Sequence, residues 1–267
     1  MELPNYDDKR AGKLIHAIYG GDVTLYTLPV ELYKQTSEVL IEAMYKGYGS
    51  DIKEFDFGTP DYELLRQLRT NIYMFGAAKT FTQVKDITGM MYKDNELVEY
   101  SKFKKSALER FKTYNQSYLE AEYTTAITSA NSAQNWEYAV DNIKLFPRFK
   151  SVAIVDSNTT AECMRMNGII ADVKDPIWNH NTPPRHWKCR CYLELLDKTD
   201  EQTSTGETKK RNVMERNDKD MQEIFKMNPG KQKLIFSDKH PYFQIEPKYK
   251  SWARQNFGLL IPKADKK

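Results

Sequence analysis

The chain of 267 residues is 40% hydrophobic and 29% charged, and its formal net charge is +3. Its mean hydropathy is −0.71 and it contains no run of eighteen apolar residues, so we predict no membrane-spanning helix and no membrane partner. The first residues carry acidic side chains and a proline where a signal peptide has an apolar stretch, which predicts that no signal peptide is present. Three cysteines argue against a disulfide framework.

The first part of the chain is predicted to be mainly helical. Residues 1–27 lack a clear hydrophobic pattern and are interpreted as irregular. A helix is expected from Pro29, which suits a first helical turn, to the glycines of KGYGS. A second helix is expected from Thr59 or Pro60 toward Gly89, because the apolar residues of this stretch recur at helical spacing.

The longest helical pattern covers residues 99–138. Small residues line one side of it and five aromatic side chains supply bulk, which is typical of a helix packed in a core. The stretch at 115–117 could divide it into two helices.

The pattern changes after Pro147, where short β-branched and apolar runs replace the long helices. Three strands are predicted, over residues 151–156, 169–173 and 191–196, with one or two helical turns between the first two. A proline-bearing loop connects the second strand to the third. We therefore expect a small sheet in this part of the chain.

The last part of the chain is polar and basic. Residues 197–212 have almost nothing to bury and are interpreted as an exposed linker. A helix over 217–227, a short strand around 234–236 and a final helix over 248–258 are predicted after it. Residues 207–267, called the basic tail below, hold 15 Lys or Arg against 8 Asp or Glu, a balance that suits polyanions or acidic protein surfaces.

Together these patterns predict an α+β protein with a helical N-terminal half, a small β-containing core and a basic C-terminal tail. The predicted organisation is a helical region at 1–98, a core at 99–198 that includes the longest helix, and a linker with the basic segment at 199–267. No repeat with a period of 20–50 residues is present, which argues against solenoid and propeller architectures.

The stretch PPRHWKCRC at 183–191 concentrates metal-ligand side chains. Thiolate sulfur and imidazole nitrogen are the preferred ligands of zinc, and a closed structural site needs four of them. The sequence offers Cys163, His186, Cys189 and Cys191, which include every cysteine of the chain. Residues two apart on a strand point to the same side, so the last two thiols can face one ion. Four protein ligands leave no position for an activated water, which favours a structural zinc ion over a catalytic one.

Other interpretations of these residues stay open. The three thiols can be inert core residues beside an exposed histidine, since free cysteine often behaves as a small apolar residue. One of them can instead be a catalytic nucleophile. A Cys189–Cys191 disulfide would close a very tight ring and leave Cys163 unpaired.

Two further residues are secondary candidates near this stretch. His180, in the loop sequence WNHN, is a spare metal ligand ranked below the other four. Asp156 is expected on the preceding strand, where its carboxylate can accept a hydrogen bond from a metal ligand or from Arg190.

An ordered set of motifs runs through this region: an apolar strand ends in Asp156, and Cys163, Gly168, DPIW and PPRHWKCRC follow. This order resembles the Mu F-like family of phage minor head, or head morphogenesis, proteins. Members have a strand that ends in Asp, a His seven residues later, a Gly soon after it and a Pro-rich loop that ends in Cys-Arg-Cys. Cys163 stands where many members have His, a change that keeps a zinc-ligand type.

The likeness extends beyond these motifs. The helical stretch YNQSYLEAEYTTAITSANSAQNW at 114–136 is similar to the segment that leads into the family's core, and 71–81 and 228–243 also look like segments of members. The likeness covers about 28–243, and its specific part is 114–191. Members often carry arginines between the Asp and the His, where this chain has SNTTAE and departs from the family.

The resemblance implies a virion component that is made in the cytoplasm of the bacterial host and built into the phage head. Such proteins associate with the portal, contact capsid or scaffold subunits, and act in head morphogenesis and in DNA packaging or ejection. The basic tail could lie against packaged DNA, whose phosphates attract Lys and Arg without sequence readout. No catalytic residues are implied, so we predict that the chain is not an enzyme.

A metal-dependent nuclease, or another phage-encoded hydrolase, is the alternative, with His186 as the base and the metal on the cysteines. Nuclease metals prefer carboxylates and water, and only Asp156, Asp172 and Asp175 stand near the thiols in the sequence. No nucleophile elbow, Walker loop, HExxH or GxGxxG motif is present. Only the nuclease would cleave plasmid DNA and lose that activity in His186→Ala.

Overall fold

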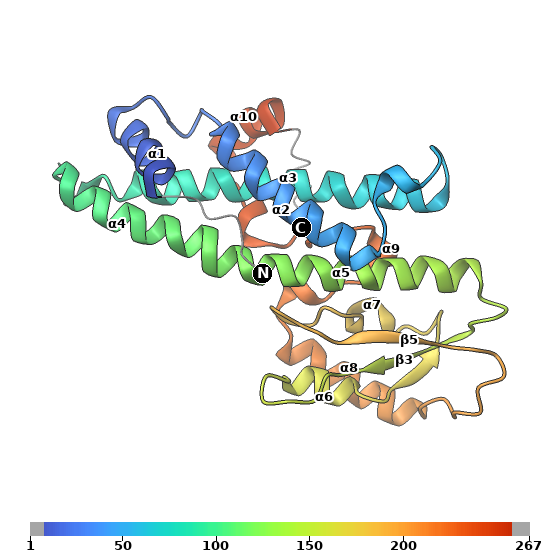
Figure 1. Ribbon diagram of the computed structural model, residues 1–267. Helices are drawn as coiled ribbons and strands as arrows, with labels where there is room; N and C mark the ends of the chain where they lie inside the picture. The colour runs from blue at the N-terminus through green and yellow to red at the C-terminus, as the bar shows by residue number, and fades with distance from the viewer. Residues whose placement is uncertain (1–7, 258–267) are drawn as a thin grey trace. The chain divides into compact units, whose positions relative to one another are not determined.

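The computed structural model describes residues 8–257 of the chain (Figure 1). The described chain divides into two compact units, and each unit is assembled from segments that are far apart in the sequence. Unit 1 contains residues 8–41, 72–121 and 240–257, and unit 2 contains residues 42–71 and 122–239. None of the described helices is both long and apolar enough to span a membrane.

Unit 1 is helical apart from one small hairpin. The elements with residues in unit 1 are α1 (Asp8–Gly20), α2 (Val30–Tyr48), α3 (Pro60–Gly89), β1 (Tyr92–Lys93), β2 (Glu96–Leu97), α4 (Tyr100–Lys112), the π-helical turn η2 (Thr113–Tyr118), η4 (Pro241–Phe243) and α10 (Pro247–Phe257). Its core forms where α1 packs against α4, with single contributions from α2 and α3. The buried side chains of this apolar cluster are Ala11, Ile15, Ile18, Leu32, Ile87, Phe103, Ala107 and Phe111.

Two of the predicted helices are confirmed, and one helix was not predicted. α2 and α3 follow the ranges expected from apolar spacing. The predicted division of the longest helix is the turn η2, which separates α4 from α5 (Leu119–Asp141). The prediction of irregular structure at 1–27 was wrong for α1. Ile15 and Ile18 are buried in the cluster with α4, and tertiary packing of this kind stabilises short helices that are marginal alone.

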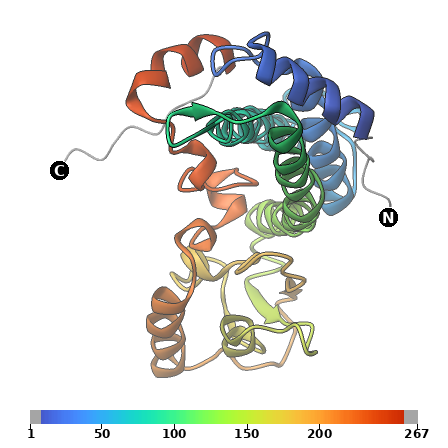
Figure 2. The ribbon, with the colours of Figure 1, turned by 90° about the vertical axis from the view of Figure 1, so that its left-hand side faces the viewer.

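Unit 2 contains a three-stranded antiparallel sheet with helices packed around it (Figures 1 and 2). Its further elements are η1 (Ile52–Glu54), β3 (Arg148–Val152), α6 (Ala161–Met166), β4 (Ile170–Asp172), α7 (Trp178–Asn181), β5 (Tyr192–Leu196), α8 (Glu207–Asp220), η3 (Glu223–Phe225) and α9 (Pro229–Gln232). The strand order is β4-β3-β5, and Phe149 of the central strand lies opposite Ala171 on one side and Leu195 on the other. α8 packs against both α6 and α7.

The core of unit 2 is centred on the aromatic ring of Phe149. The ring of Trp136, from α5, stacks on it with centroids 5.6 Å apart, and the ring of Trp178, from α7, meets it edge-on at 5.9 Å. Aromatic pairs of this kind stabilise the folded state by more than the burial of their surface area alone. The indole nitrogen of Trp178 donates to the carbonyl oxygen of Asp172 at 2.9 Å, so the buried polar atom is satisfied. Gly230 packs so closely that an added Cβ would lie 2.3 Å from the Cβ of Trp136.

The first predicted strand is displaced toward the N-terminus. β3 ends at Val152, which is the last residue paired with β5, opposite Tyr192. Ile154 and Val155 are 42% and 61% exposed, so the apolar run of the sequence continues past the end of the sheet. The prediction of a strand over 151–156 was therefore wrong at both ends, whereas β4, β5 and α6 lie where strands and helical turns were expected.

The helix α8 contradicts two predictions, an exposed linker over 197–212 and a helix over 217–227. Its buried face includes polar residues, which a hydropathy pattern does not register. Lys210 is buried and forms ion pairs with Asp175 and with Glu207 one turn earlier. Helices held by buried polar contacts of this kind cannot be located from apolar periodicity.

The segment at 234–236, predicted as a strand, contains no strand in the described chain. The amide oxygen of Asn71 accepts hydrogen bonds from the backbone nitrogens of Ile235 and Phe236 at 2.9 and 2.8 Å, and its amide nitrogen donates to the carbonyl oxygen of Phe236 at 3.0 Å. One buried side chain thus satisfies backbone groups that a neighbouring strand would otherwise bind.

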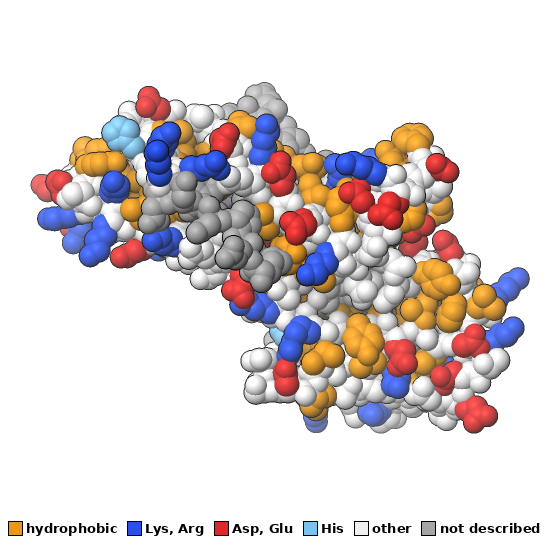
Figure 3. Space-filling model, viewed as in Figure 1, with side chains coloured by type: hydrophobic (Ala, Val, Ile, Leu, Met, Phe, Trp, Pro, Cys, Tyr) orange, Lys and Arg blue, Asp and Glu red, His pale blue; other side chains and the backbone are white. Residues whose placement is uncertain are grey.

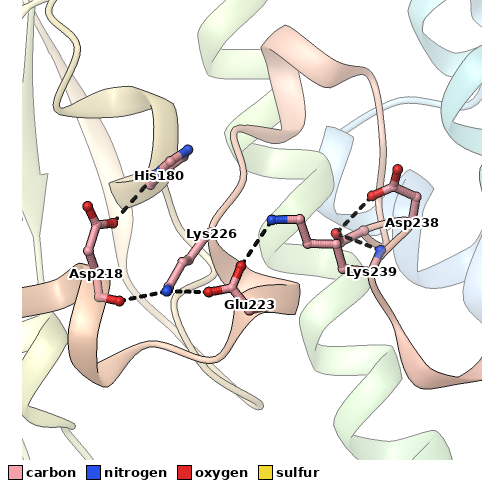
Figure 4. A network of polar contacts seen from close by, with 7 residues as sticks. His180, Asp218, Glu223, Lys226, Asp238 and Lys239 are labelled. Carbon is pink, nitrogen blue, oxygen red and sulfur yellow. Dashed lines mark hydrogen bonds and ion pairs between the residues drawn. The ribbon is translucent and has the colours of Figure 1, made fainter. Parts of the chain in front are cut away.

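A polar network joins α7, α8, η3 and the segment after α9 (Figure 4). Nζ of Lys226 donates to the carbonyl oxygen of Asp218 at 2.6 Å and pairs with Glu223. Glu223 also pairs with Lys239 at 3.0 Å. His180 lies 3.4 Å from the carboxylate of Asp218. The network is largely exposed, so we expect it to contribute little to stability.

Candidate metal centre

The structure brings the three cysteines of the chain together. Cys163 lies in the middle of α6, and Cys189 and Cys191 lie in the segment that leads into β5. Their sulfur atoms are all within 4.8 Å of one another, and those of Cys163 and Cys189 are 3.7 Å apart. The three residues are 0%, 0% and 5% exposed, and together with Ala153 they form a small buried cluster. We refer to the three sulfurs as the thiol cluster.

The loop before β5 holds its two thiols in place through backbone geometry. The backbone nitrogen of Cys189 donates to the carbonyl oxygen of His186 at 3.3 Å, which closes a turn. Lys188, inside this turn, has a positive φ of 58°. The hydroxyl of Thr128, on α5, donates to the carbonyl oxygen of Cys189 at 2.6 Å and fixes the turn against the helix. Arg190 is exposed between two buried thiols, as expected for an extended segment that faces the cluster with every second residue.

His186 lies at the edge of the thiol cluster and is half-buried. Its Nδ1 is 2.8 Å from the carbonyl oxygen of Trp187; a carbonyl only accepts, so Nδ1 carries a proton and Nε2 is left for the thiols. Burial lowers the pKa of the ring, but hydrogen bonds with Cys163 and Cys189 outweigh it and raise the pKa to about 10. Among the described residues, the donor atoms that are mutually within 4.8 Å are the three sulfurs, and the imidazole contacts two of them.

The electrostatics of the thiol cluster favour a negative charge on one sulfur. Hydrogen bonds from Cys163 and Cys191 lower the pKa of Cys189. Hydrogen bonds with Cys163 and Cys189 raise the pKa of Cys191. Among the three thiols, that of Cys189 therefore forms the thiolate most readily, and the thiolate is the form that binds metals.

Arg185 is a functional candidate that was not singled out from the sequence. The residue is only 1% exposed, and its Nη1 lies 4.0 Å from the sulfur of Cys163. One indication was present in the motif, where Arg185 stands next to the predicted ligand His186. The burial of Arg185 could not be deduced from the sequence, where it is an arginine between a proline and a histidine.

Asp156 accepts hydrogen bonds from Arg190 through both carboxylate oxygens, at 2.7 and 2.6 Å. Of the two predicted donors, a metal ligand and Arg190, the structure thus shows the second. Its position differs from the prediction, since it lies in the turn after β3 and not on the strand. The hydrogen bond from Arg190 and that from the backbone nitrogen of Asn158 lower the pKa of the carboxyl. The pair is exposed and lies outside the buried thiols.

The remaining sequence candidates lie apart from the thiol cluster. His180, the spare ligand, is exposed and contacts Asp218. Asp175 caps the backbone nitrogen of Ile177 and pairs with Lys210. Within the described residues, the potential metal-binding group at this site contains sulfur ligands and no carboxylate.

This donor set fits a thiophilic ion. Three thiols and one imidazole are a known combination for structural zinc, and all the sulfurs are withdrawn from solvent. Carboxylate-rich sites, by contrast, suit magnesium and calcium. The arrangement is suited to holding an ion and offers few of the groups needed to activate water.

Comparison with known proteins places this region in a family. The sequence model described as Phage Mu protein F like protein matches residues 98–194. The chain is similar to the Mu-like prophage FluMu F protein of Haemophilus influenzae, with 36% identity over 73 residues, which are 27% of this chain. It is also similar to protein F of Escherichia phage Mu, which is named for capsid assembly, with 27% identity over 74 residues, or 28% of this chain. The matched stretch spans 17% of the length of each of these relatives.

No solved structure matches the chain. The matched residues 98–194 extend from the start of α4 into β5 and include all four predicted ligands. Residues 98–194 of the chain thus match the phage Mu protein F-like family.

Proposed function

We propose that this chain is a structural component of a phage head that acts in head morphogenesis and resides in the virion. The observation that carries the proposal is the family match over 98–194, which coincides with the region organised around the thiol cluster. The family is one of head morphogenesis proteins and not of known catalysts. A relative named for capsid assembly supports the same role.

The proposal is tested in a phage that carries this gene. Deletion is expected to give aberrant or non-infectious heads by electron microscopy while terminase and tail proteins are still made. The protein should be found by mass spectrometry in purified particles of the parent phage. Normal, infectious heads after deletion, or absence of the protein from particles and procapsids, would contradict a role in head assembly.

The partners that we propose are the portal protein, capsid or scaffold subunits, and DNA during packaging or ejection. Co-expression with the portal protein of the same phage should give a complex that survives size-exclusion chromatography. Co-expression with the major capsid protein alone serves as the comparison. Failure to bind either protein would remove the portal and capsid assignments.

A basic groove supports the proposed contact with DNA. A cavity of about 460 Å³ between α6 and α8 is lined by Arg165, Thr208, Lys209, Asn212, Val213 and Arg216. No carboxylate is among these lining residues, and within the described chain neither Lys209 nor Arg216 forms an ion pair. Figure 3 shows basic and acidic side chains interspersed over the visible face of the molecule. The groove is thus a better candidate for phosphates than the basic tail as a whole.

The DNA contact can be measured as the salt dependence of binding to duplex DNA by fluorescence anisotropy. Each phosphate contact contributes about 0.9 to the slope of log K against log salt, so the double variant Lys209→Gln/Arg216→Gln should lower the slope by about 2. The control Lys104→Gln/Lys105→Gln removes two exposed lysines of α4 and should leave the slope unchanged. Equal effects of both variants would place the contact elsewhere.

We also propose that the thiol cluster and His186 hold a structural zinc ion. The zinc would tie α6, a helix of six residues, to the segment before β5. Purified protein should contain about one equivalent of zinc. In Cys191→Ser the zinc content should fall, and unchanged thermal stability in that variant would exclude a structural role.

The alternative, a metal-dependent nuclease, has no supporting observation beyond the thiols themselves. Its test is plasmid cleavage with a series of divalent ions. Cleavage by the wild type that disappears in His186→Ala would establish the enzyme and overturn the structural proposal.

A further inference from the structure

Arg185 is a buried charge in the wall of the thiol cluster. Its Nε donates to the carbonyl oxygen of Asn181 at 2.8 Å, and its Nη2 donates to the hydroxyl of Ser151 at 2.7 Å. Its Nη1 approaches the sulfur of Cys163 at 4.0 Å. These contacts fix the guanidinium on three sides, with the sulfur on one of them.

A buried guanidinium needs a negative partner. Arginine does not lose its proton in proteins, and an uncompensated buried charge strongly destabilises the folded state. The carbonyl oxygen of Asn181 and the hydroxyl of Ser151 carry no net charge. Within the described residues Arg185 forms no ion pair with a carboxylate. The remaining source of negative charge at this guanidinium is the thiol cluster.

The other two cations of the motif are different. Lys188 and Arg190 are both exposed, and Arg190 pairs with Asp156 outside the cluster. Only Arg185 is enclosed with the sulfurs. Of the three cationic side chains of PPRHWKCRC, one is thus buried and two lie at the surface.

Charge counting gives Arg185 a specific task. Three thiolates, one neutral imidazole and one divalent ion have a net charge of −1 in a site shielded from water. The guanidinium brings this sum to zero, whereas a monovalent ion would leave −1 and a trivalent ion +1. We propose that Arg185 is the internal counter-cation of the metal-loaded thiol cluster and favours a divalent, thiophilic ion there. This inference rests on the proposed metal site.

The experiment compares Arg185→Met, which removes the charge and keeps much of the side-chain length, with Arg185→Lys, which retains the charge. Arg190→Met is the matched control, because it removes an exposed cation of the same motif that pairs with Asp156. Zinc affinity is measured by competition with a chromogenic chelator. Cobalt substitution reports the sulfur-to-metal charge-transfer band, and circular dichroism reports folding.

Loss of a group that supports metal ligands typically weakens metal binding about 10- to 100-fold. We expect a loss in this range for Arg185→Met, recovery to within about threefold of the wild type for Arg185→Lys, and no change for Arg190→Met. A folded Arg185→Met protein with wild-type affinity would overturn the proposal. So would an Arg185→Lys protein that folds but binds zinc as weakly as expected for the uncharged variant.

The proposed role of Arg185 and the proposed metal site are contradicted by different outcomes. If the wild type binds neither zinc nor cobalt, the metal site itself is wrong, and the role of Arg185 falls with it. If the wild type binds zinc and all variants bind it equally, the metal site stands and only the role of Arg185 is removed. If Arg185→Met does not fold, the comparison of Arg185→Lys with the wild type still decides the matter.

Discussion

The apolar core of unit 1 and the thiol cluster of unit 2 solve the same problem by different means. In unit 1, α1 and α4 contribute six of the eight buried apolar side chains of one cluster, and this burial alone can hold the two helices together. In unit 2, α6 is only six residues long, and the cluster that it shares with the segment before β5 contains three thiols and one alanine. This cluster itself buries little apolar area, and the proposed zinc ion would cross-link the two segments there. With the proposed zinc ion bound, the second region would depend on a component other than the chain, whereas the first depends on apolar burial alone.

The largest effect that separates the two regions is expected from removal of the proposed zinc ion. Chelation, or Cys191→Ser, should cost several kcal/mol because structural zinc contributes its binding energy to folding. Hydrogen exchange should show lost protection over about 156–195 and retained protection in α1 and α4. Cys191→Ser should itself be insensitive to the chelator, which provides the internal control. Loss of protection in both regions to the same degree would remove the distinction.

Acidic pH should weaken unit 1 through His240. Burial, followed by the positive charge of Lys79, lowers the pKa of His240 to about 4. The folded-state pKa lies below the usual value of about 6.5, so the unfolded chain binds the proton more readily. The contribution to stability is complete above pH 6.5 and is lost as the pH falls toward 4, with a total of about 3 kcal/mol.

The pH effect is measured by denaturation between pH 4 and 7. Nδ1 of His240 accepts a hydrogen bond from the backbone nitrogen of Tyr242 at 3.2 Å. Asparagine can also accept this bond, so His240→Asn should flatten the pH profile. His16→Asn changes an exposed histidine of the same unit and should leave the profile as it is. An identical profile in all three proteins would show that His240 does not cause the loss.

A matched pair of glycines compares helix packing in the two units. A Cβ on Gly47, at the end of α2 in unit 2, would lie 2.1 Å from the carbonyl oxygen of Ile127 on α5, so Gly47→Ala should cost about 1–3 kcal/mol. Gly12, in α1 of unit 1, has no atom within 4 Å of such a Cβ, so Gly12→Ala should stabilise by up to about 1 kcal/mol. Denaturant midpoints of both variants measure the difference, and equal midpoints would refute the close packing.

The smallest effect is expected from the exposed network of Figure 4. Hydrogen bonds from Lys226 and then Lys239 lower the pKa of Glu223 to about 2. The contribution of this carboxylate is present above pH 4.5 and is lost as the pH falls toward 2. Since the carboxylate is largely exposed, Glu223→Gln should cost less than about 1 kcal/mol at pH 7 and less still in high salt. A larger, salt-independent loss would show that the network is structural.

Sequence patterns located the elements whose stability comes from apolar periodicity. α2, α3 and the divided longest helix were predicted because their apolar residues repeat at helical spacing over many turns. α1 was missed because its stability comes from contacts with α4, 80 or more residues away in the sequence. α8 was missed because Lys210 and Asn217 are buried through polar contacts that no hydropathy scale rewards.

The candidate site was predictable in its ligands and not in its surroundings. Cysteine and histidine are rare in the chain, so their spacing in PPRHWKCRC was informative, and Cys163 followed from the order of the elements. The structure confirms that the three thiols meet. The enclosure of Arg185 depends on Ser151 and Asn181, which come from a strand and a short helix elsewhere in the sequence. Such a contact requires the tertiary fold.

The position of the outer two cysteines in the chain has a consequence for the unfolded state. An ion bound by both Cys163 and Cys191 would close a ring of 29 residues. The chain-entropy relation used for covalent cross-links gives the effect of such a ring. It reduces the conformational entropy of a denatured chain that keeps the ion, which raises the free energy of that chain by about 3–4 kcal/mol. A chain that has unfolded elsewhere would then keep this ring, and α6, β4 and β5 could refold from it.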